Sequence, residues 1–342
     1  MAWLKSIDGI WLMLIAAAIG AVATLAVGKL LIPVLKRLKC GQTERDDGPQ
    51  SHLSKSGTPT MGGIMMLAAV LLACVATVAG DPEFAITSIL VMFGYGLIGF
   101  IDDYIKVVKH RSLGLNAKQK LVAQVGLALV LAIYAYKSPM IGSELYIPIV
   151  KKYVEFGWFY IPFVVFVVLA TTNSVNLTDG LDGLASGVTT VVMAAVALIL
   201  NFSAVALAAS GASAQLVENT RNLMVFSSAV AGACIGFLHY NKYPAKVFMG
   251  DTGSMALGAA FVVTTVLSRT VLIIPILGLM FMVSSVSDII QVASYKLRNK
   301  KRVFLMAPLH HHFEKKGSSE VSITRAYVLI TLAMAVVTLL IV

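Results

Sequence analysis

Long apolar runs without charged residues recur along the whole chain, and they decide the solvent in which it folds. A bilayer core is about 30 Å thick, so a helix that crosses it needs about 20 apolar residues. Of the 342 residues, 58% are hydrophobic and 13% are charged, which is too apolar for an ordinary soluble domain. The sequence therefore predicts an all-α, polytopic integral membrane protein, and a helical bundle in water is the disfavoured alternative.

Ten transmembrane helices are predicted. They lie near residues 11–35, 61–80, 84–101, 121–136, 158–172, 184–207, 223–238, 254–268, 271–286 and 326–342. The first is too long for a cleavable signal peptide and lacks a small-residue cleavage site. Residues 144–153 alternate in polarity as in a small hairpin. No linker or low-complexity segment interrupts the chain, so residues 1–342 are expected to form a single transmembrane domain.

Basic residues are distributed unevenly between the two sets of loops. If both termini lie on the periplasmic or extracellular side, the cytoplasmic loops hold 20 of the 27 Lys and Arg residues and the opposite side holds 6. This asymmetry follows the positive-inside rule. The net charge of +10 is spread over loops that flank helices, so it indicates topology and not a nucleic-acid partner.

Acidic and amide residues gather at helix ends on the predicted cytoplasmic face. A transporter or flippase, the alternative from another class, needs ionisable groups near the bilayer midplane or an inverted repeat. Neither is evident in the sequence. A cluster on one face favours a reaction at the membrane interface.

Two polar segments of this face flank the second and third predicted helices. Residues 41–63 are rich in glycine and contain Lys55 and Thr60, which suits either an anion-binding loop or a plain turn. Asp102 and Asp103 end the third helix. Adjacent helical residues point about 100° apart, so we expect one aspartate to face a cleft and the other to pair with a nearby lysine. A charged helix end without function is the alternative.

The third segment follows the fifth predicted helix. Asn173, Asn176, Asp179 and Asp182 recur every three residues, which in a helical or tight-turn backbone places them on one side. Amides donate and accept hydrogen bonds while carboxylates only accept, and this combination suits the polar edge of a sugar or nucleobase.

The fourth segment is divided between two loops. Asp251 lies between two glycines where the eighth predicted helix begins, and His310, His311 and His312 lie in a basic loop. A site of oxygen ligands with bound phosphates suits Mg²⁺. Three consecutive histidines point in different directions, so zinc is the weaker alternative and phosphate contacts are expected.

Five long motifs carry a family resemblance. They read DGPQSHLSKSGTPTMGG, GFIDDY, NSVNLTDGLDGLA, YPAKVFMGDTGS and MAPLHHHFEKKG, and the match runs from about residue 41 to residue 317. The layout of ten helices also agrees. In this order they resemble the bacterial phospho-N-acetylmuramoyl-pentapeptide transferases, the MraY family. The chain departs from the pattern at Ser284 and Ser285, where many members are expected to carry a glutamate, and this weakens expectations about Gln291.

The resemblance implies a reaction. Undecaprenyl phosphate would attack the β-phosphate of UDP-N-acetylmuramoyl-pentapeptide, release UMP and form lipid I for peptidoglycan synthesis. The enzyme would require Mg²⁺, lie in the bacterial inner membrane and work on its cytoplasmic face. A homodimer is compatible with the resemblance. The nearest alternative is a sister enzyme that transfers N-acetylglucosamine phosphate from UDP, although SKSGTPTMGG and APLHHHFEKKG favour the muramoyl-peptide branch.

The resemblance also assigns roles to residues. It implies catalytic roles for Asp102, Asp103, Asp251 and His310, with Asp251 as the Mg²⁺ ligand and Asp102 as a base or positioning group for the acceptor. The implied nucleotide and sugar pocket contains Lys55, Asn173, Asn176, Asp179, Asp182, Asn241 and Phe248, whose ring would stack on uracil. Phosphate contacts are implied for Thr60, Lys118, His311 and His312.

Overall fold

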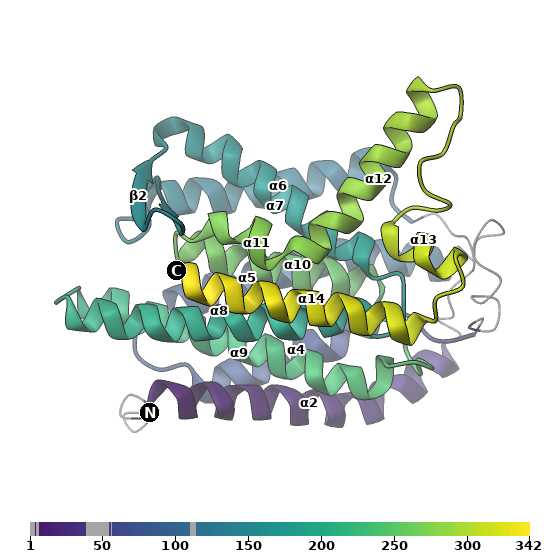
Figure 1. Ribbon diagram of the computed structural model, residues 1–342. Helices are drawn as coiled ribbons and strands as arrows, with labels where there is room; N and C mark the ends of the chain where they lie inside the picture. The colour runs from purple at the N-terminus through teal and green to yellow at the C-terminus, as the bar shows by residue number, and fades with distance from the viewer. Residues whose placement is uncertain (1–3, 5–6, 39–54, 56, 110–113) are drawn as a thin grey trace.

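Long helices run side by side in the computed structural model (Figure 1), which describes residues 4, 7–38, 55, 57–109 and 114–342. Residues 41–54, the first part of the predicted polar segment 41–63, therefore lie outside the described residues. The helices are α2 (Gly9–Arg37), α4 (Gly63–Thr77), α5 (Glu83–Val108), α6 (Ala117–Lys137), α7 (Tyr160–Thr178), α8 (Leu184–Ala209), α9 (Ala214–Asn241), α10 (Gly250–Leu267), α11 (Ile274–Leu277), α12 (Leu279–Leu297), α13 (Leu309–Lys315) and α14 (Glu320–Ile341).

The all-α membrane architecture is confirmed. Within the described residues, eight helices are long and apolar enough to cross a membrane, and a ninth is added if a bent pair is one span. The remaining predicted span, residues 61–80, corresponds to α4, which has 15 residues. Because α4 is shorter than the bilayer core requires of a straight helix, the count of ten stays a prediction.

The ninth predicted span differs from a single straight helix. Residues 271–277 form a short 3-10 turn, Val271–Ile273, followed by α11, and α12 then leaves at an angle of 79°. The break falls at Gly278. A Cβ atom added at this glycine would lie 2.8 Å from the Ile274 carbonyl oxygen and 3.0 Å from the Phe261 ring, which leaves no room for a side chain. As a result, α12 continues to Leu297 and projects beyond the bundle (Figure 1).

The helices α9 and α10 form the centre of the bundle. The most apolar 18-residue window is 83% buried in α9 and 89% buried in α10. Small residues allow this packing. A Cβ atom added at Gly99 of α5 would lie 2.1 Å from the Asp251 carbonyl oxygen. One added at Gly63 of α4 would lie 2.2 Å from the Gly253 backbone nitrogen. The first turn of α10 is therefore held against the backbones of both α4 and α5.

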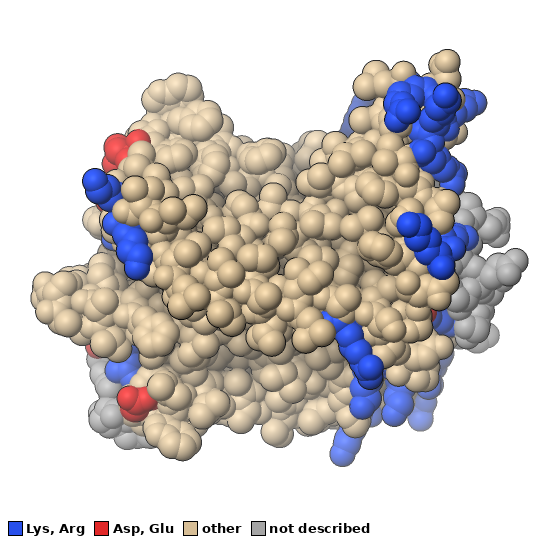
Figure 2. All heavy atoms as spheres, in the orientation of Figure 1, with Lys and Arg blue, Asp and Glu red and all other residues tan. Residues whose placement is uncertain are grey.

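The predicted hairpin is confirmed at one end of the bundle. The strands β1 (Glu144–Ile147) and β2 (Lys152–Glu155) pair antiparallel, with Glu144 opposite Glu155. The start of α2 and the end of α14 lie at this same end (Figure 1). On the face seen in Figure 2, most Lys and Arg side chains gather at the opposite end, as the uneven charge distribution predicts.

Candidate active site

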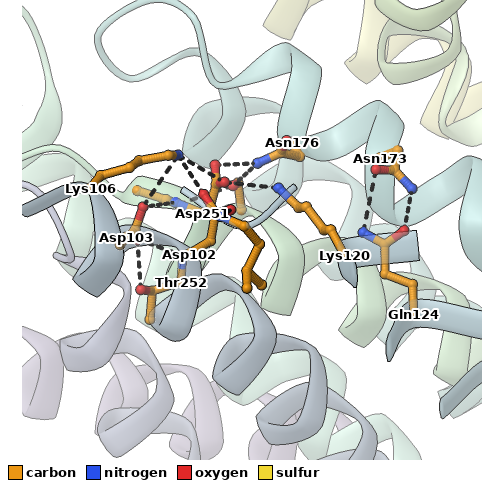
Figure 3. Close-up of polar contacts among 12 residues, drawn as sticks. Asp102, Asp103, Lys106, Lys120, Gln124, Asn173, Asn176, Asp251 and Thr252 are labelled. Carbon is orange, nitrogen blue, oxygen red and sulfur yellow. Dashed lines mark hydrogen bonds and ion pairs between the residues drawn. The ribbon is translucent and has the colours of Figure 1, made fainter. Parts of the chain in front are cut away.

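Three carboxylates converge near the end of the bundle that is far from the hairpin. Asp102 and Asp103 lie near the end of α5, and Asp251 lies in the first turn of α10. One oxygen from each lies within 4.8 Å of the others (Figure 3). The expectation that the adjacent aspartates diverge, one to a cleft and one to a lysine, was therefore incomplete. Because α10 begins directly against α5, its aspartate reaches both.

Asp103 fixes the start of α10. Its carboxylate accepts hydrogen bonds from the backbone N–H of Asp251 at 3.1 Å, and from the backbone N–H and the hydroxyl of Thr252 at 2.9 and 2.7 Å. The first N–H groups of a helix have no partner within the helix, and a buried carboxylate there is favoured. Asp103 thus orients Asp251 while being 3% exposed itself.

Two lysines balance the carboxylates, and only Lys106 agrees with the expectation that a nearby lysine pairs with one of the adjacent aspartates. Lys106 Nζ lies 2.6 Å from Asp102 and 3.1 Å from Asp251, and Lys120 Nζ lies 2.8 Å from Asp251. Lys106 follows Asp102 by four residues, a spacing that pairs opposite charges on a helix, whereas Lys120 belongs to another helix and was not expected. The implied phosphate contact Lys118 is exposed, whereas Lys120, two residues further along the same helix, contacts Asp251.

The amides of α7 divide between two partners. Asn176 donates to Asp251 Oδ1 and to Ser254 Oγ, both at 2.8 Å. Asn173 instead exchanges hydrogen bonds with Gln124 of α6 at 2.9 and 3.4 Å (Figure 3). Asn176 therefore belongs to the carboxylate cluster, and Asn173 joins α7 to α6.

The polar row does not continue to Asp182. Because α7 ends at Thr178, the chain turns before Asp182, whose carboxylate accepts from Lys55 Nζ at 2.8 Å and from the Ala245 backbone N–H at 2.9 Å. The prediction that all four residues share one side is therefore wrong. Asp179 lies between the two groups, near enough to feel the charges of both Asp251 and Asp182.

A second polar cluster surrounds Asn241, beside Asp182. Its side-chain oxygen accepts from the Gly183 backbone N–H and the Ser186 hydroxyl, both at 3.1 Å, and its amide donates to the Val247 carbonyl at 3.0 Å. Phe248 follows, and its backbone pairs with Pro59 at 2.8 Å and with Gly62 at 2.9 Å. The half-buried Phe248 ring is thus held where two loops meet.

Thr60 lies beside the glycine that precedes Asp251. A side chain at Gly250 would lie 2.5 Å from Asp103 Oδ2 and 2.8 Å from Thr60 Oγ1, so both residues border this glycine. Gly250 has φ +71°, a conformation that favours glycine. Thr60 is therefore at the edge of the carboxylate cluster.

The three histidines have different environments on the short helix α13. His310 and His311 are buried, and His311 Nδ1 lies 3.0 Å from Glu314. His312 Nδ1 accepts the Leu305 backbone N–H at 3.0 Å, so it stabilises its own loop. A side chain at Gly180 would lie 2.3 Å from His310 Nε2, which places α13 directly against the turn after α7. His311 Nε2 would lie 3.0 Å from the same added side-chain atom, so both His310 and His311 lie against this turn.

The carboxylate cluster fits a hard divalent cation. In the described part of the chain, one group of three or more Asp, Glu, His or Cys side chains lies close enough together to hold a metal ion. It consists of Asp102, Asp103 and Asp251. All three offer oxygen, which Mg²⁺ prefers to nitrogen or sulfur. The Asp251 carboxylate is the most accessible, with 18% of its side chain exposed. The residues present therefore suit Mg²⁺, and no comparable set suits zinc within the described residues.

Asp179 gives a testable pH dependence. Burial and the charges of Asp251, Asp103 and Asp182 raise the pKa of Asp179 from 3.8 to about 8. Between these values the folded state binds more protons than the unfolded state, so stability falls as the pH rises through that window. In EDTA, Asp179→Asn should therefore raise the Tm by a few degrees at pH 9 and by much less at pH 5. A Tm difference that does not change with pH would contradict this arrangement of charges.

Comparisons with known proteins agree with the motifs. The sequence model of Glycosyl transferase family 4 matches residues 85–269. A phospho-N-acetylmuramoyl-pentapeptide-transferase of Desulfitobacterium hafniense is 46% identical over 94% of this chain and 95% of its own length. Proteins of that name from Clostridioides difficile and Thermoanaerobacter sp. are 44% and 45% identical over 93% of this chain, and 94% and 95% of their own lengths.

These relatives match almost the whole chain, so they cover every helix that contributes to the carboxylate cluster. The family model covers α5 to α10, which carry Asp102, Asp103 and Asp251. The chain therefore belongs to the phospho-N-acetylmuramoyl-pentapeptide-transferase family.

Proposed function

We propose that this enzyme transfers phospho-N-acetylmuramoyl-pentapeptide from its UDP donor to undecaprenyl phosphate, giving lipid I and UMP. The observation that carries the proposal is the convergence of Asp102, Asp103 and Asp251 at one end of a membrane bundle. The acceptor has a long apolar tail and a phosphate head, so its reactive group lies at the headgroup level. Carboxylates at the helix ends are placed to meet that phosphate together with a soluble donor.

The chemistry needs charge neutralisation and positioning more than proton transfer. An oxygen of the acceptor phosphate forms a bond to the β-phosphorus, and the bond from that phosphorus to the bridging oxygen breaks, so the bridging oxygen leaves with UMP. The acceptor phosphate is largely ionised at neutral pH, because the second pKa of such a group is about 6. No base is therefore required, and positioned charges can supply most of the catalysis.

Residues of the cluster divide these tasks. Asp251, supported by Asp102 and Asp103, would hold Mg²⁺, which supplies positive charge to the donor diphosphate when bound. Lys106 and Lys120 add positive charge at the same place, each within 3.1 Å of Asp251. Asn176 fixes the Asp251 carboxylate from the side of α7.

The donor can be tested with the purified protein. UMP release should be at least about 100-fold faster, in terms of kcat/KM, with UDP-N-acetylmuramoyl-pentapeptide than with UDP-N-acetylglucosamine, a discrimination of about 2.7 kcal/mol. Equal use of the two donors, or preference for the second, would assign the chain to the N-acetylglucosamine phosphate branch. No UMP release with either donor would exclude the proposed transfer.

The active site lies on the cytoplasmic face of the bacterial inner membrane, and the hairpin lies outside. The distribution of Lys and Arg in Figure 2 supports this orientation.

We further propose that the chain crosses the membrane ten times, with α4 as one span and the bent pair of α11 and α12 as another. Residues 1–342 would then form one catalytic domain. An even number of crossings agrees with α2 beginning and α14 ending at the same end of the bundle (Figure 1).

Cysteine labelling tests this orientation. Lys152 of the hairpin and Ser318 between α13 and α14 are both exposed and lie in different loops. In right-side-out vesicles and a Cys40→Ser background, an impermeant maleimide should label Lys152→Cys at once and Ser318→Cys only after the vesicles are opened. Cys40 itself lies outside the described residues. The reverse labelling pattern would place the carboxylate cluster on the outer face.

A further inference from the structure

Glu320 joins three distant parts of the chain, and it was not among the expected site residues. It is the first residue of α14, and it is 8% exposed. Its Oε2 accepts from Lys55 Nζ at 2.7 Å and from the Asp182 backbone N–H at 3.3 Å. These contacts bridge 265 and 138 residues of sequence, so they are tertiary contacts between separate loops.

The position of Glu320 is set by its helix. The Ser319 hydroxyl accepts the Ser322 backbone N–H at 3.3 Å and so begins α14 immediately before Glu320. A carboxylate in the first turn of a helix is stabilised by the helix dipole. Glu320 is therefore a fixed negative charge, and Lys55 and the turn at Asp182 are held to it.

Lys55 is consequently not a free positive charge. It lies between Asp182 at 2.8 Å and Glu320 at 2.7 Å, and 12% of its side chain is exposed. Burial lowers the pKa of Lys55, but the hydrogen bonds and charges of the two carboxylates outweigh burial and raise it above its usual value. Two carboxylates around one ammonium group leave a net negative charge, which disfavours a phosphate at this place.

The chemistry left to Lys55 is donation to a neutral oxygen. A lysine ammonium has three N–H donors, and among the described residues the two carboxylates accept from two of them. The third can reach a carbonyl or hydroxyl oxygen of the kind found on a nucleobase or a ribose. The same Asp182 carboxylate accepts from Ala245, which begins the segment leading to Phe248. Lys55 and the aromatic ring are therefore positioned through one acidic pair.

We propose that Glu320 is a positioning residue for the nucleoside part of the donor. It acts through Lys55 and the Asp182 backbone, and it does not touch the reacting atoms. This inference rests on the proposed function. It separates the site into a nucleoside end, held by Glu320, and a diphosphate end at Asp102, Asp103 and Asp251.

The variant Glu320→Gln tests the assignment, because the amide has nearly the same shape and can still accept a hydrogen bond. The KM for the UDP donor should rise about tenfold, which corresponds to about 1.4 kcal/mol, while kcat and the KM for undecaprenyl phosphate change by less than about threefold. The affinity for UMP, measured by calorimetry, should fall by the same factor as the donor KM rises. A fall in kcat with an unchanged donor KM would overturn the proposal.

A double-mutant cycle with Lys55 shows whether Glu320 acts through that residue. In a Lys55→Met background, Glu320→Gln should change UMP affinity by less than about twofold, because the contact is already lost. Full additivity of the two changes would overturn the proposal. Should Glu320→Gln fail to fold, as judged by thermal unfolding, the UMP affinity of Lys55→Met decides, and a value equal to wild type would overturn it.

Glu83→Gln is the matched control. Glu83 also lies in the first turn of a long helix and accepts a side-chain hydrogen bond, from Tyr134, but it is at the hairpin end of the bundle. It should leave UMP affinity unchanged, and an equal loss in both variants would overturn the specific role of Glu320. Failure of the proposed function is recognised separately, because the wild-type protein would then release no UMP from the muramoyl-pentapeptide donor.

Discussion

Asp251→Asn should lower the rate of UMP release by at least about 1,000-fold, because single electrostatic groups at such sites account for factors of about 100 to 1,000 and Asp251 would also lose the metal. Asp251 is the most exposed of the three carboxylates and contacts Lys106, Lys120 and Asn176. The variant should fold, since an amide can replace the carboxylate as a hydrogen-bond acceptor. A rate above about one tenth of wild type, a loss below about 1.4 kcal/mol, would exclude Asp251 as the principal ligand.

Removal of the metal should reproduce this loss in the wild-type protein. EDTA should abolish UMP release, and added Mg²⁺ or Mn²⁺ should restore it, because the available ligands are oxygen atoms. Asp81→Asn serves as the control, since Asp81 contacts Gln215 and the Glu83 backbone near the hairpin end and far from the cluster. It should retain the wild-type rate and the same response to EDTA.

The second large effect should separate the adjacent aspartates. Asp102→Asn should slow UMP release at least about 100-fold with little change in Tm, because Asp102 pairs with Lys106 and one backbone N–H. Asp103→Asn should reduce both the rate and the Tm. Its carboxylate accepts three hydrogen bonds from the start of α10, and bonds to a charged group contribute about 1.5–3 kcal/mol each.

Activity and thermal unfolding of the two variants, measured side by side, decide between these roles. Equal Tm losses would mean that Asp103 has no special part in holding α10. A wild-type rate for Asp102→Asn at every pH would remove Asp102 from the catalytic group. Restoration of that rate at high pH, where the acceptor phosphate is fully ionised, would favour a base over an electrostatic role.

Most of the fold follows from the apolar runs, because burial in lipid dictates helices wherever about 20 such residues occur. The bend at Gly278 does not follow from hydropathy. The apolar run continues through Gly278, and only the structure shows that Phe261 and the Ile274 carbonyl pack closely against this glycine at the bend. Hydropathy also did not predict the length of α12. This helix extends beyond the predicted span to Leu297, and its second half carries exposed apolar residues such as Ile289.

The carboxylates of the candidate site were predictable from the sequence. Asp102 and Asp103 on α5, and Asp251 at the start of α10, stood out because charges at helix ends are conspicuous in an apolar chain. Partners from other elements were hidden. Nothing in the local sequence joins Lys120 to Asp251, or Glu320 to Lys55, since these pairs are separated by 131 and 265 residues. Tertiary packing alone brings them together.

The pairing of Lys106 with Asp102 also bears on how the chain enters the membrane. The two residues lie one helical turn apart on α5, whereas Asp251 is synthesised 145 residues after Lys106. An unpaired carboxylate costs about 2.5–3.5 kcal/mol at the centre of a membrane helix on insertion scales, and less at a helix end such as that of Asp102. Because α5 carries its own counter-ion, Asp102 can be paired as soon as α5 has formed, before the rest of the chain is made. When α10 arrives, Lys106 is in place to receive the next aspartate.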